Sequence, residues 1–196
     1  MEYEIVREWR KSLRLVVKKE KIIVKAPHFL PKSVIEEFVE RNRAYIQKMT
    51  APPRHFFYLS KKIPIRSCDR GWSMQDGIFF SDDNHRKNIE SFLKEKAKAY
   101  IPQRVETLAR MFGERYARVR ITSARTRWGS CSARGNLNFT WRLMMHAPDV
   151  IDYVIVHELC HLTHMNHSKA FWELVESRMP GYRELEKELK RIEISI

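Results

Sequence analysis

The sequence predicts an α+β fold in two parts. Residues 1–83 are expected to form an N-terminal lobe of a β-hairpin, a helix and irregular strands. In residues 84–196 we expect a buried helix beside a small, mostly antiparallel sheet. Three observations support this: short segments alternate apolar and polar residues, longer segments repeat apolar residues at helical spacing, and Pro or Gly separates them. With 196 residues, 43% of them hydrophobic, the chain can bury a core.

The first strands are predicted from alternation. Apolar residues occupy every second position of two segments, and the polar stretch 18–21 between the segments predicts a hairpin turn. They are Leu13, Leu15 and Val17 in the first segment and Ile22, Val24 and Ala26 in the second. Residues 3–8 are candidates for a third strand.

A helix should follow, because Pro31 suits a first turn and apolar residues recur at helical spacing through about residue 50, before Pro52. Residues 54–83 show short apolar runs. Turns are expected at Arg70-Gly71 and Asp76-Gly77.

A long amphipathic helix is predicted from about residue 84 to 112, with Pro102 kinking or splitting it and Gly113 as its C-cap. A strand is expected at 119–123, and residues 136–143 are its expected partner, with a turn at 132–135.

The next helix opens at Pro148 and Asp149, a proline and an acid favoured in a first turn. Asn166 is expected to make a left-handed turn after it, and Ser168 to cap a further helix that ends near Pro180. A charged closing helix is expected over residues 183–194.

The segment 154–172 contains His157, Glu158 and His161 in the spacing H-E-x-x-H. Side chains four residues apart lie on one face of a helix, so both imidazoles can bind one metal ion while Glu158 flanks it. Zinc acidifies a bound water, and the neighbouring carboxylate can accept the proton as general base. The alternative is that these histidines are packed core residues without a metal.

A third ligand is needed for a catalytic zinc site. His167 lies ten residues after His157, the separation found in longer H-E-x-x-H motifs, although His164 occupies their glycine position. Glu173 and Glu176, in the following helix, are rival ligands. Spacing favours His167 over both.

The residues from Arg127 to Leu189 resemble the YgjP-type, zincin-like metallopeptidase family, which is distantly similar to the SprT-like and WLM metallopeptidases associated with DNA repair. The resemblance rests on WGSC at 128–131, DYVIVHELCHL at 152–162 and NHSKAFW at 166–172. It implies a zincin-like catalytic domain, a zinc-dependent hydrolase of the HExxH type, zinc ligands His157, His161 and His167, and Glu158 as general base. The substrate would be a protein or peptide.

In folds of this kind, the sheet beside the metal helix offers an edge strand to an extended peptide. Arg127, Trp128 and Asn138 are therefore candidates for substrate contact, although packing roles are equally ordinary for them. Four residues can donate a hydrogen bond to a developing oxyanion, and the sequence does not choose among them. They are His164, Tyr182, Arg127 and Arg142.

The net charge of +13 is uneven: residues 1–120 carry +12, residues 121–148 carry +4, and residues 149–196 carry −3. The basic part could attract nucleic acid or acidic polypeptides. A basic nucleic-acid-associated zinc module, acting on DNA-bound proteins, is therefore the alternative function. A solvated basic surface is the simpler interpretation, since no nucleic-acid motif accompanies the charge.

Three cysteines, Cys68, Cys131 and Cys160, lack paired spacing and indicate reduced thiols. The charged N-terminus lacks the apolar region of a signal peptide. No apolar run is long enough for a transmembrane helix. We therefore expect a cytoplasmic protein without membrane contact.

Overall fold

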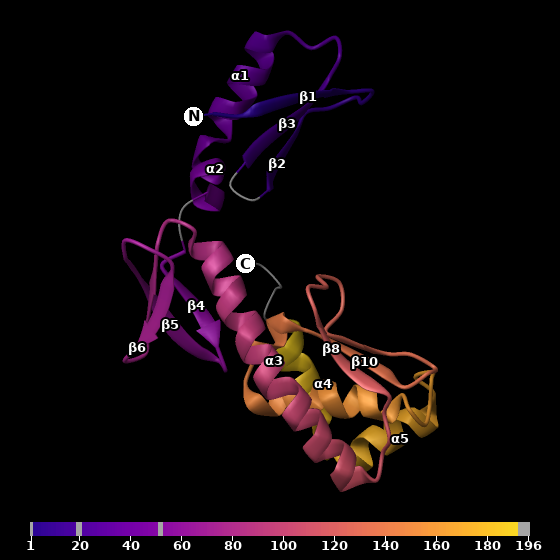
Figure 1. Cartoon of the computed structure of the whole chain (residues 1–196). Coiled ribbons are helices and arrows are strands. Elements are labelled where there is room, and N and C mark those ends of the chain that lie inside the picture. Colours follow the sequence, from indigo (N-terminus) through magenta and orange to yellow (C-terminus); the bar gives the residue numbers. More distant parts are fainter. Residues whose placement is uncertain (1, 19–20, 51–52, 192–196) are drawn as a thin grey trace. The chain divides into compact units, whose positions relative to one another are not determined.

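A computed structural model of the chain describes residues 2–18, 21–50 and 53–191. The chain divides into two compact units, Met1–Pro52 and Pro53–Ile196 (Figure 1). The sequence placed residues 53–83 with the N-terminal lobe, whereas here they pack in the larger unit: the rings of Phe56 and Phe79 lie 5.7 and 5.5 Å from that of Phe92. A functional division at residue 84 stays a prediction.

The smaller unit is a three-stranded sheet packed on two helices. Strands β2 and β3 form the predicted antiparallel hairpin, and β1, the predicted third strand, pairs with β3 in parallel. Residues 19–20 of the predicted turn lie outside the described residues. Ile22, Val24 and Ala26 of β3 form the core with residues of both helices. The elements are β1 (Glu4–Glu8), β2 (Arg14–Lys18), β3 (Lys21–Pro27), α1 (Lys32–Arg41) and α2 (Arg43–Thr50).

The single helix predicted up to residue 50 is divided at Asn42. The Asn42 side-chain amide donates to the Phe38 carbonyl oxygen at 2.8 Å, and its backbone N–H bonds the carbonyls of Phe38 and Val39. An asparagine side chain competes for helical carbonyls in this way, so the helix ends and restarts.

The larger unit begins with a four-stranded sheet in the order β4-β5-β7-β6. The predicted turn at Asp76-Gly77 is present, whereas at Arg70-Gly71 the chain only bends, since β5 and β6 do not pair with each other. Asp76 and Gly77 have φ of 49° and 75°, as the two-residue turn of a tight hairpin requires. The strands are β4 (His55–Tyr58), β5 (Lys61–Ser67), β6 (Trp72–Gln75) and β7 (Ile78–Ser81).

Helix α3 (His85–Phe112) runs unbroken through Pro102 and ends at Gly113, whose φ is 68°. The predicted C-cap is therefore confirmed, while the helix is not split. Pro102 removes the hydrogen bond to the carbonyl of Lys98. Lys98 lies on the exposed side of the helix, where water can replace the lost partner.

A second sheet in this unit has the order β8-β10-β9 and consists of β8 (Arg118–Thr122), β9 (Gly129–Cys131) and β10 (Asn136–Thr140). Strand β10 is parallel to β8 and antiparallel to β9. The prediction of a mostly antiparallel sheet is wrong here, because the chain forms β9 before it returns as β10. The sheets are small and mixed.

After β10 the chain forms a 3-10 helix, η1 (Trp141–Met145), and three helices, α4 (Pro148–Cys160), α5 (Lys169–Arg178) and α6 (Tyr182–Arg191). Residues 141–143, predicted as strand, belong to η1. Ser168 caps α5 by accepting from the Phe171 N–H at 3.4 Å, as predicted. Residues 192–194 of the predicted closing helix lie outside the described part.

The predicted left-handed turn at Asn166 is wrong, since Asn166 has no positive φ. Short-range hydrogen bonds close the end of α4 instead: the N–H groups of Thr163 and His164 both bond the Cys160 carbonyl, at 3.1 and 2.9 Å. With these carbonyl partners the chain leaves α4 without a left-handed residue.

Helix α4 packs against both α3 and strand β9 of the second sheet (Figure 1). Its residues Val150, Ile151 and Ile155 are fully buried. Arg104 of α3 and Asp152 of α4 form a two-pronged ion pair with both N···O distances at 2.6 Å. None of the helices in the described residues combines the length and apolarity needed to span a bilayer.

We expect Asp152→Asn to lower the free energy of unfolding by about 1–2 kcal/mol, because it removes the charge from a bidentate pair whose Arg104 partner is 36% exposed. Urea unfolding measures the change. Glu90→Gln is the control, since it alters a half-exposed pair with Lys94 that has one hydrogen-bonded contact within a single helix, and it should cost less than about 0.5 kcal/mol. Equal losses in both variants would contradict a special role for the α3–α4 pair.

Candidate metal centre

Three histidines converge beside the end of α4. His157 lies in the last turn of α4, His161 is its C-cap residue, and His167 lies in the loop before α5. One ring nitrogen from each lies within 4.8 Å of the others, and the Nε2 atoms of His157 and His167 are 3.1 Å apart. Among the described residues, this is the group of His, Cys, Asp and Glu side chains arranged to hold a metal ion.

The imidazoles of His157 and His161 are held in the neutral form. Burial, together with the nearby His161 and His167, lowers the pKa of His157 to about 3. Burial also lowers the pKa of His161. Neutral imidazole is the form that binds metal, so protons do not compete for these nitrogens near neutral pH.

Neighbouring groups fix the ring orientations. His161 Nδ1 lies 2.9 Å from the carbonyl oxygen of His164, which accepts its proton and leaves Nε2 free to face the other histidines. The fully buried ring of Phe171 stacks on His161 with a centroid distance of 4.5 Å, and Trp172 stacks on His167 at 5.5 Å. Both aromatic residues come from α5, so this helix positions two of the three rings.

Glu158 follows His157 and is only 6% exposed. Its Oε2 atom has no hydrogen-bond partner among the described residues. Burial raises the pKa of Glu158 to about 8, and the positive charge of Arg127 opposes that shift. A buried carboxyl group with a raised pKa beside three converging histidines is an arrangement often found where a catalytic base is needed.

Strand β9 passes directly over this carboxyl group. A Cβ atom added at Gly129 would lie 2.6 Å from Glu158 Oε1 and 2.7 Å from its Cγ. Real Cβ atoms do not approach other atoms so closely, so Gly129 is required for the strand to cover Glu158.

An ion pair holds the ends of the three helices together. Arg178 of α5 pairs with Glu114, which follows α3, and both side chains are largely buried. Arg178 Nη1 also lies 3.6 Å from Cys160 Sγ, and the Thr163 hydroxyl donates to Glu114 at 3.2 Å. The pair therefore fixes α5 against the end of α4, which carries His157 and His161.

The sequence profile described as "YgjP-like, metallopeptidase domain" matches residues 78–192, more than half of the chain. The chain belongs to the YgjP-like metallopeptidase family. Membership in the YgjP-like family implies a peptidase with a protein substrate and a bound metal, and the three histidines could hold that metal.

Two crystal structures of archaeal metallopeptidase zymogens are similar in part. Abylysin of Pyrococcus abyssi is 24% identical with a TM-score of 0.43, covering 46% of this chain and 92% of that protein. Jannalysin of Methanocaldococcus jannaschii is 17% identical with a TM-score of 0.42, covering 46% and 94%. No curated protein matches the sequence.

The rival ligands lie apart from the histidine cluster of this YgjP-like chain. Glu173 is exposed and pairs with Lys169 at 3.5 Å. Glu176 Oε1 accepts from the Gly181 N–H at 3.2 Å. Neither belongs to the group that could hold a metal.

Two of the four candidate oxyanion donors are buried in other contacts. Arg142 is buried and donates to the carbonyls of Ser123 and Ala124, while Tyr182 is buried and stacks between Trp172 and Tyr153.

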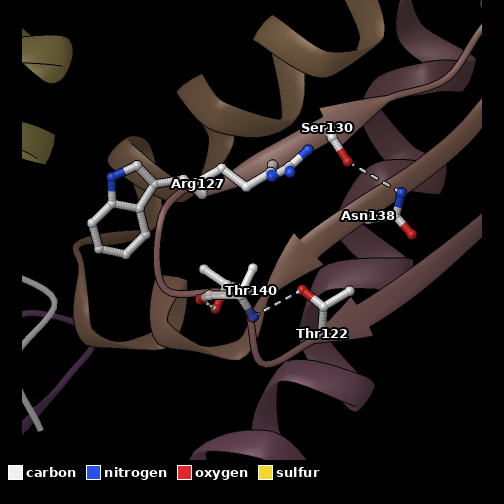
Figure 2. Close-up of a pocket in the computed structure, with 8 residues that line it drawn as sticks. Thr122, Arg127, Ser130, Asn138 and Thr140 are labelled. Carbon is white, nitrogen blue, oxygen red and sulfur yellow. Dashed lines mark hydrogen bonds between the residues drawn. The ribbon is translucent and has the colours of Figure 1, made fainter. Parts of the chain in front are cut away.

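Of the remaining candidates for oxyanion or substrate contact, His164 supplies its carbonyl to His161. Arg127, Trp128 and Asn138 line a pocket on the second sheet, and the Arg127 side chain extends over it toward Ser130 (Figure 2).

The sequence alone did not predict roles for Gly129, Glu114 and Arg178. Gly129 carried a signal, because a glycine in a strand can mark a close approach of two parts of the chain. The Glu114–Arg178 pair spans 64 residues and had no local signal.

Gly129→Ala should destabilise the protein by about 1–3 kcal/mol, because the new methyl group overlaps the Glu158 side chain. Urea unfolding of the four members of a double-mutant cycle with Glu158→Ala measures the coupling. Shortening Glu158 removes the overlapping atoms, so Gly129→Ala should cost little in that background. An equal cost in both backgrounds would show that the methyl group meets something else.

Proposed function

We propose that this peptidase is zinc-dependent and of the HExxH type, and that it hydrolyses peptide bonds with Glu158 as general base. In this proposal residues 84–196 form a zincin-like catalytic domain, with His157, His161 and His167 as the metal ligands. The observation that carries the proposal is the convergence of three imidazole nitrogens beside one buried carboxyl group.

The donor set suits zinc. Two nitrogens bound to a tetrahedral zinc at 2.0–2.1 Å lie roughly 3.3 Å apart, close to the 3.1 Å between the Nε2 atoms of His157 and His167. Three neutral imidazoles leave one position of a tetrahedral ion for water or substrate, as in catalytic sites. A zinc ion held there would supply Lewis acidity, acidifying water and polarising a peptide carbonyl.

Glu158 would accept a proton from the attacking water at Oε2, the atom that no described residue bonds. Its burial makes it a stronger base than an exposed glutamate, because the charged carboxylate is poorly solvated. Strand β9 limits the motion of the side chain through the contact at Gly129. The same carboxyl group can then return the proton to the leaving amine.

Strand β9 lies at the end of its sheet, so one side of its backbone is available to an extended peptide. A peptide paired there would lie next to Glu158, because Gly129 of β9 contacts that side chain. We infer that the substrate binds in an extended conformation along β9.

Nucleic acid binding, the alternative suggested by the basic charge, stays a prediction. It requires salt-sensitive binding of DNA or RNA that survives Glu158→Gln. Cytoplasmic location likewise stays a prediction.

Elemental analysis of the purified protein tests the metal site. We expect about one zinc per chain in the wild type and in Glu158→Gln, and loss of zinc in His157→Ala. His167→Ala should weaken zinc binding more than about a hundredfold, since even loss of an outer-sphere partner costs 10- to 100-fold. Full zinc occupancy in His167→Ala, with loss in Glu173→Ala or Glu176→Ala, would give the third position to a glutamate.

Hydrolysis of an unfolded protein substrate tests the base. Glu158→Gln keeps the size of the side chain but cannot accept the proton, so kcat should fall by about 10²- to 10⁴-fold while zinc stays bound. The control is Glu173→Gln, an exposed residue of α5, which should keep wild-type activity. Undiminished hydrolysis by zinc-loaded Glu158→Gln would exclude Glu158 as the base.

A further inference from the structure

The second sheet carries a pocket of about 220 Å³ on its outer face (Figure 2). All three strands of the sheet and the segment between β8 and β9 contribute to its walls. The lining residues are Thr122, Ala124, Arg127, Trp128, Gly129, Ser130, Asn138 and Thr140.

The pocket and Glu158 lie on opposite faces of β9. Successive residues of a strand point to opposite sides, and Gly129 faces Glu158. Ser130, the next residue, therefore points to the outer face, where its hydroxyl accepts from the Asn138 amide at 3.2 Å. Leu137 and Phe139, the neighbours of Asn138 along β10, are fully buried on the inner side. Glu158 therefore lies against Gly129 on one face of β9, and the next residue, Ser130, lines the pocket on the other face.

Some hydrogen-bonding groups of the pocket are engaged within the protein, and others have no partner among the described residues. Thr140 donates its hydroxyl to the Ala124 carbonyl at 2.9 Å, and Thr122 donates to the Phe139 carbonyl at 3.3 Å. The Ser130 hydroxyl and one Asn138 N–H donate to no residue that the structure describes. Asn138 Oδ1 likewise accepts from no described residue, but with the Arg127 guanidinium the free donors outnumber it, which suits an acceptor-rich ligand.

The charge of the pocket is positive. Arg127 is exposed and forms no hydrogen bond or ion pair with any described residue. None of the eight lining residues is acidic. Behind the wall, the buried guanidinium of Arg142 stacks on Trp141 at 4.1 Å and bonds the carbonyls of Ser123 and Ala124, again without a carboxylate among the described residues. Neither cation forms a direct ion pair with a described carboxylate, and only Glu158 and Glu90 act on them at longer range. An anionic guest is therefore favoured.

The size of the pocket restricts that guest. A volume of about 220 Å³ is below the roughly 300–1,000 Å³ of sites that enclose whole small molecules. It has room for one side chain, and the planar guanidinium of Arg127 matches a carboxylate with two parallel hydrogen bonds.

We propose that this pocket is a specificity subsite that receives an acidic side chain, Asp or Glu, of the peptide substrate, with Arg127 as the recognising cation. A peptide lying along β9 presents alternate side chains to the two faces of the sheet, so one side chain reaches the pocket while the adjoining part of the peptide lies beside Glu158. This inference rests on the proposed peptidase function and adds the class of substrate.

A binding experiment tests the subsite without turnover. The probes are capped pentapeptides of alanine with Glu, Gln or Lys at the centre, titrated by NMR into the zinc-loaded full chain carrying Glu158→Gln. We expect the Glu peptide to bind at least about tenfold more tightly than the Gln peptide, as for a charge-assisted pair. Arg127→Gln should remove this difference, and Arg127→Glu should turn the preference toward the Lys peptide.

Arg134→Glu is the matched control. It makes the same change of charge on an exposed residue that precedes β10 and does not line the pocket, so the preference for the Glu peptide should persist. Equal binding of the Glu and Gln peptides, or a difference that survives Arg127→Gln, would overturn the proposal. Tighter, Arg127-dependent binding of a short single-stranded DNA would overturn it in favour of a nucleic acid.

Cleavage-site profiling separates this proposal from the proposed function. The wild type, digesting a peptide library made from a whole proteome, should cleave at bonds with Asp or Glu at one fixed position, and Arg127→Glu should exchange that preference for Lys or Arg. Cleavage without any acidic preference would overturn the subsite and leave the peptidase standing. Absence of cleavage, together with Arg127-dependent binding of the Glu peptide, would remove the proposed function and keep the acidic site.

Discussion

The burial of the Glu158 carboxyl group is the constraint to which the larger unit is fitted. A carboxylate taken out of water without a partner costs several kcal/mol, and the Oε2 atom has none among the described residues. Strand β9 lies against it, with Gly129 at a position where no side chain fits. The rest of its surroundings are the apolar helix α4 and histidines such as His157, whose lowered pKa keeps the ring neutral. Such an arrangement is costly for the protein alone. It becomes favourable if a cation binds the imidazoles, because the nearby positive charge stabilises the carboxylate.

Much of the helical part of this site could be predicted from local sequence. The signals for these helices are local. Pro148 opens α4, Ser168 caps α5, and the helical end that carries His157, Glu158 and His161 lies where their spacing predicted a helix. Strand β9 escaped prediction because three residues, Gly129–Cys131, are too few to show alternation. The parallel pairing of β8 with β10 and the contact between Glu114 and Arg178 join distant parts of the chain. Their cause is packing, which no local pattern records.

The second sheet divides the chemistry of the protein between its two faces. Inward residues such as Leu137 and Phe139 pack in the core of the larger unit, whereas outward residues are hydroxyl, amide and guanidinium groups. Residues 121–148 contain four arginines and no acidic residue, which in the sequence suggested a general basic surface. The structure gives two of these arginines a specific place at the second sheet. Arg142 is a buried support for the segment after β8, and Arg127 stands over the pocket. A basic composition can thus reflect a few placed cations rather than an extended field.

The position of His167 has a consequence for how the site is assembled. His157 and His161 belong to one continuous helical end, but His167 lies in the loop before α5, and its ring is held by stacking on Trp172 of that helix. The three nitrogens therefore meet only while α5 is docked through Phe171 and the Arg178–Glu114 pair. Local opening of α5 would dismantle the cluster without unfolding α4. An ion bound by all three imidazoles would in turn hold α5 in its docked position. The stability of the C-terminal helices would then depend on the concentration of metal.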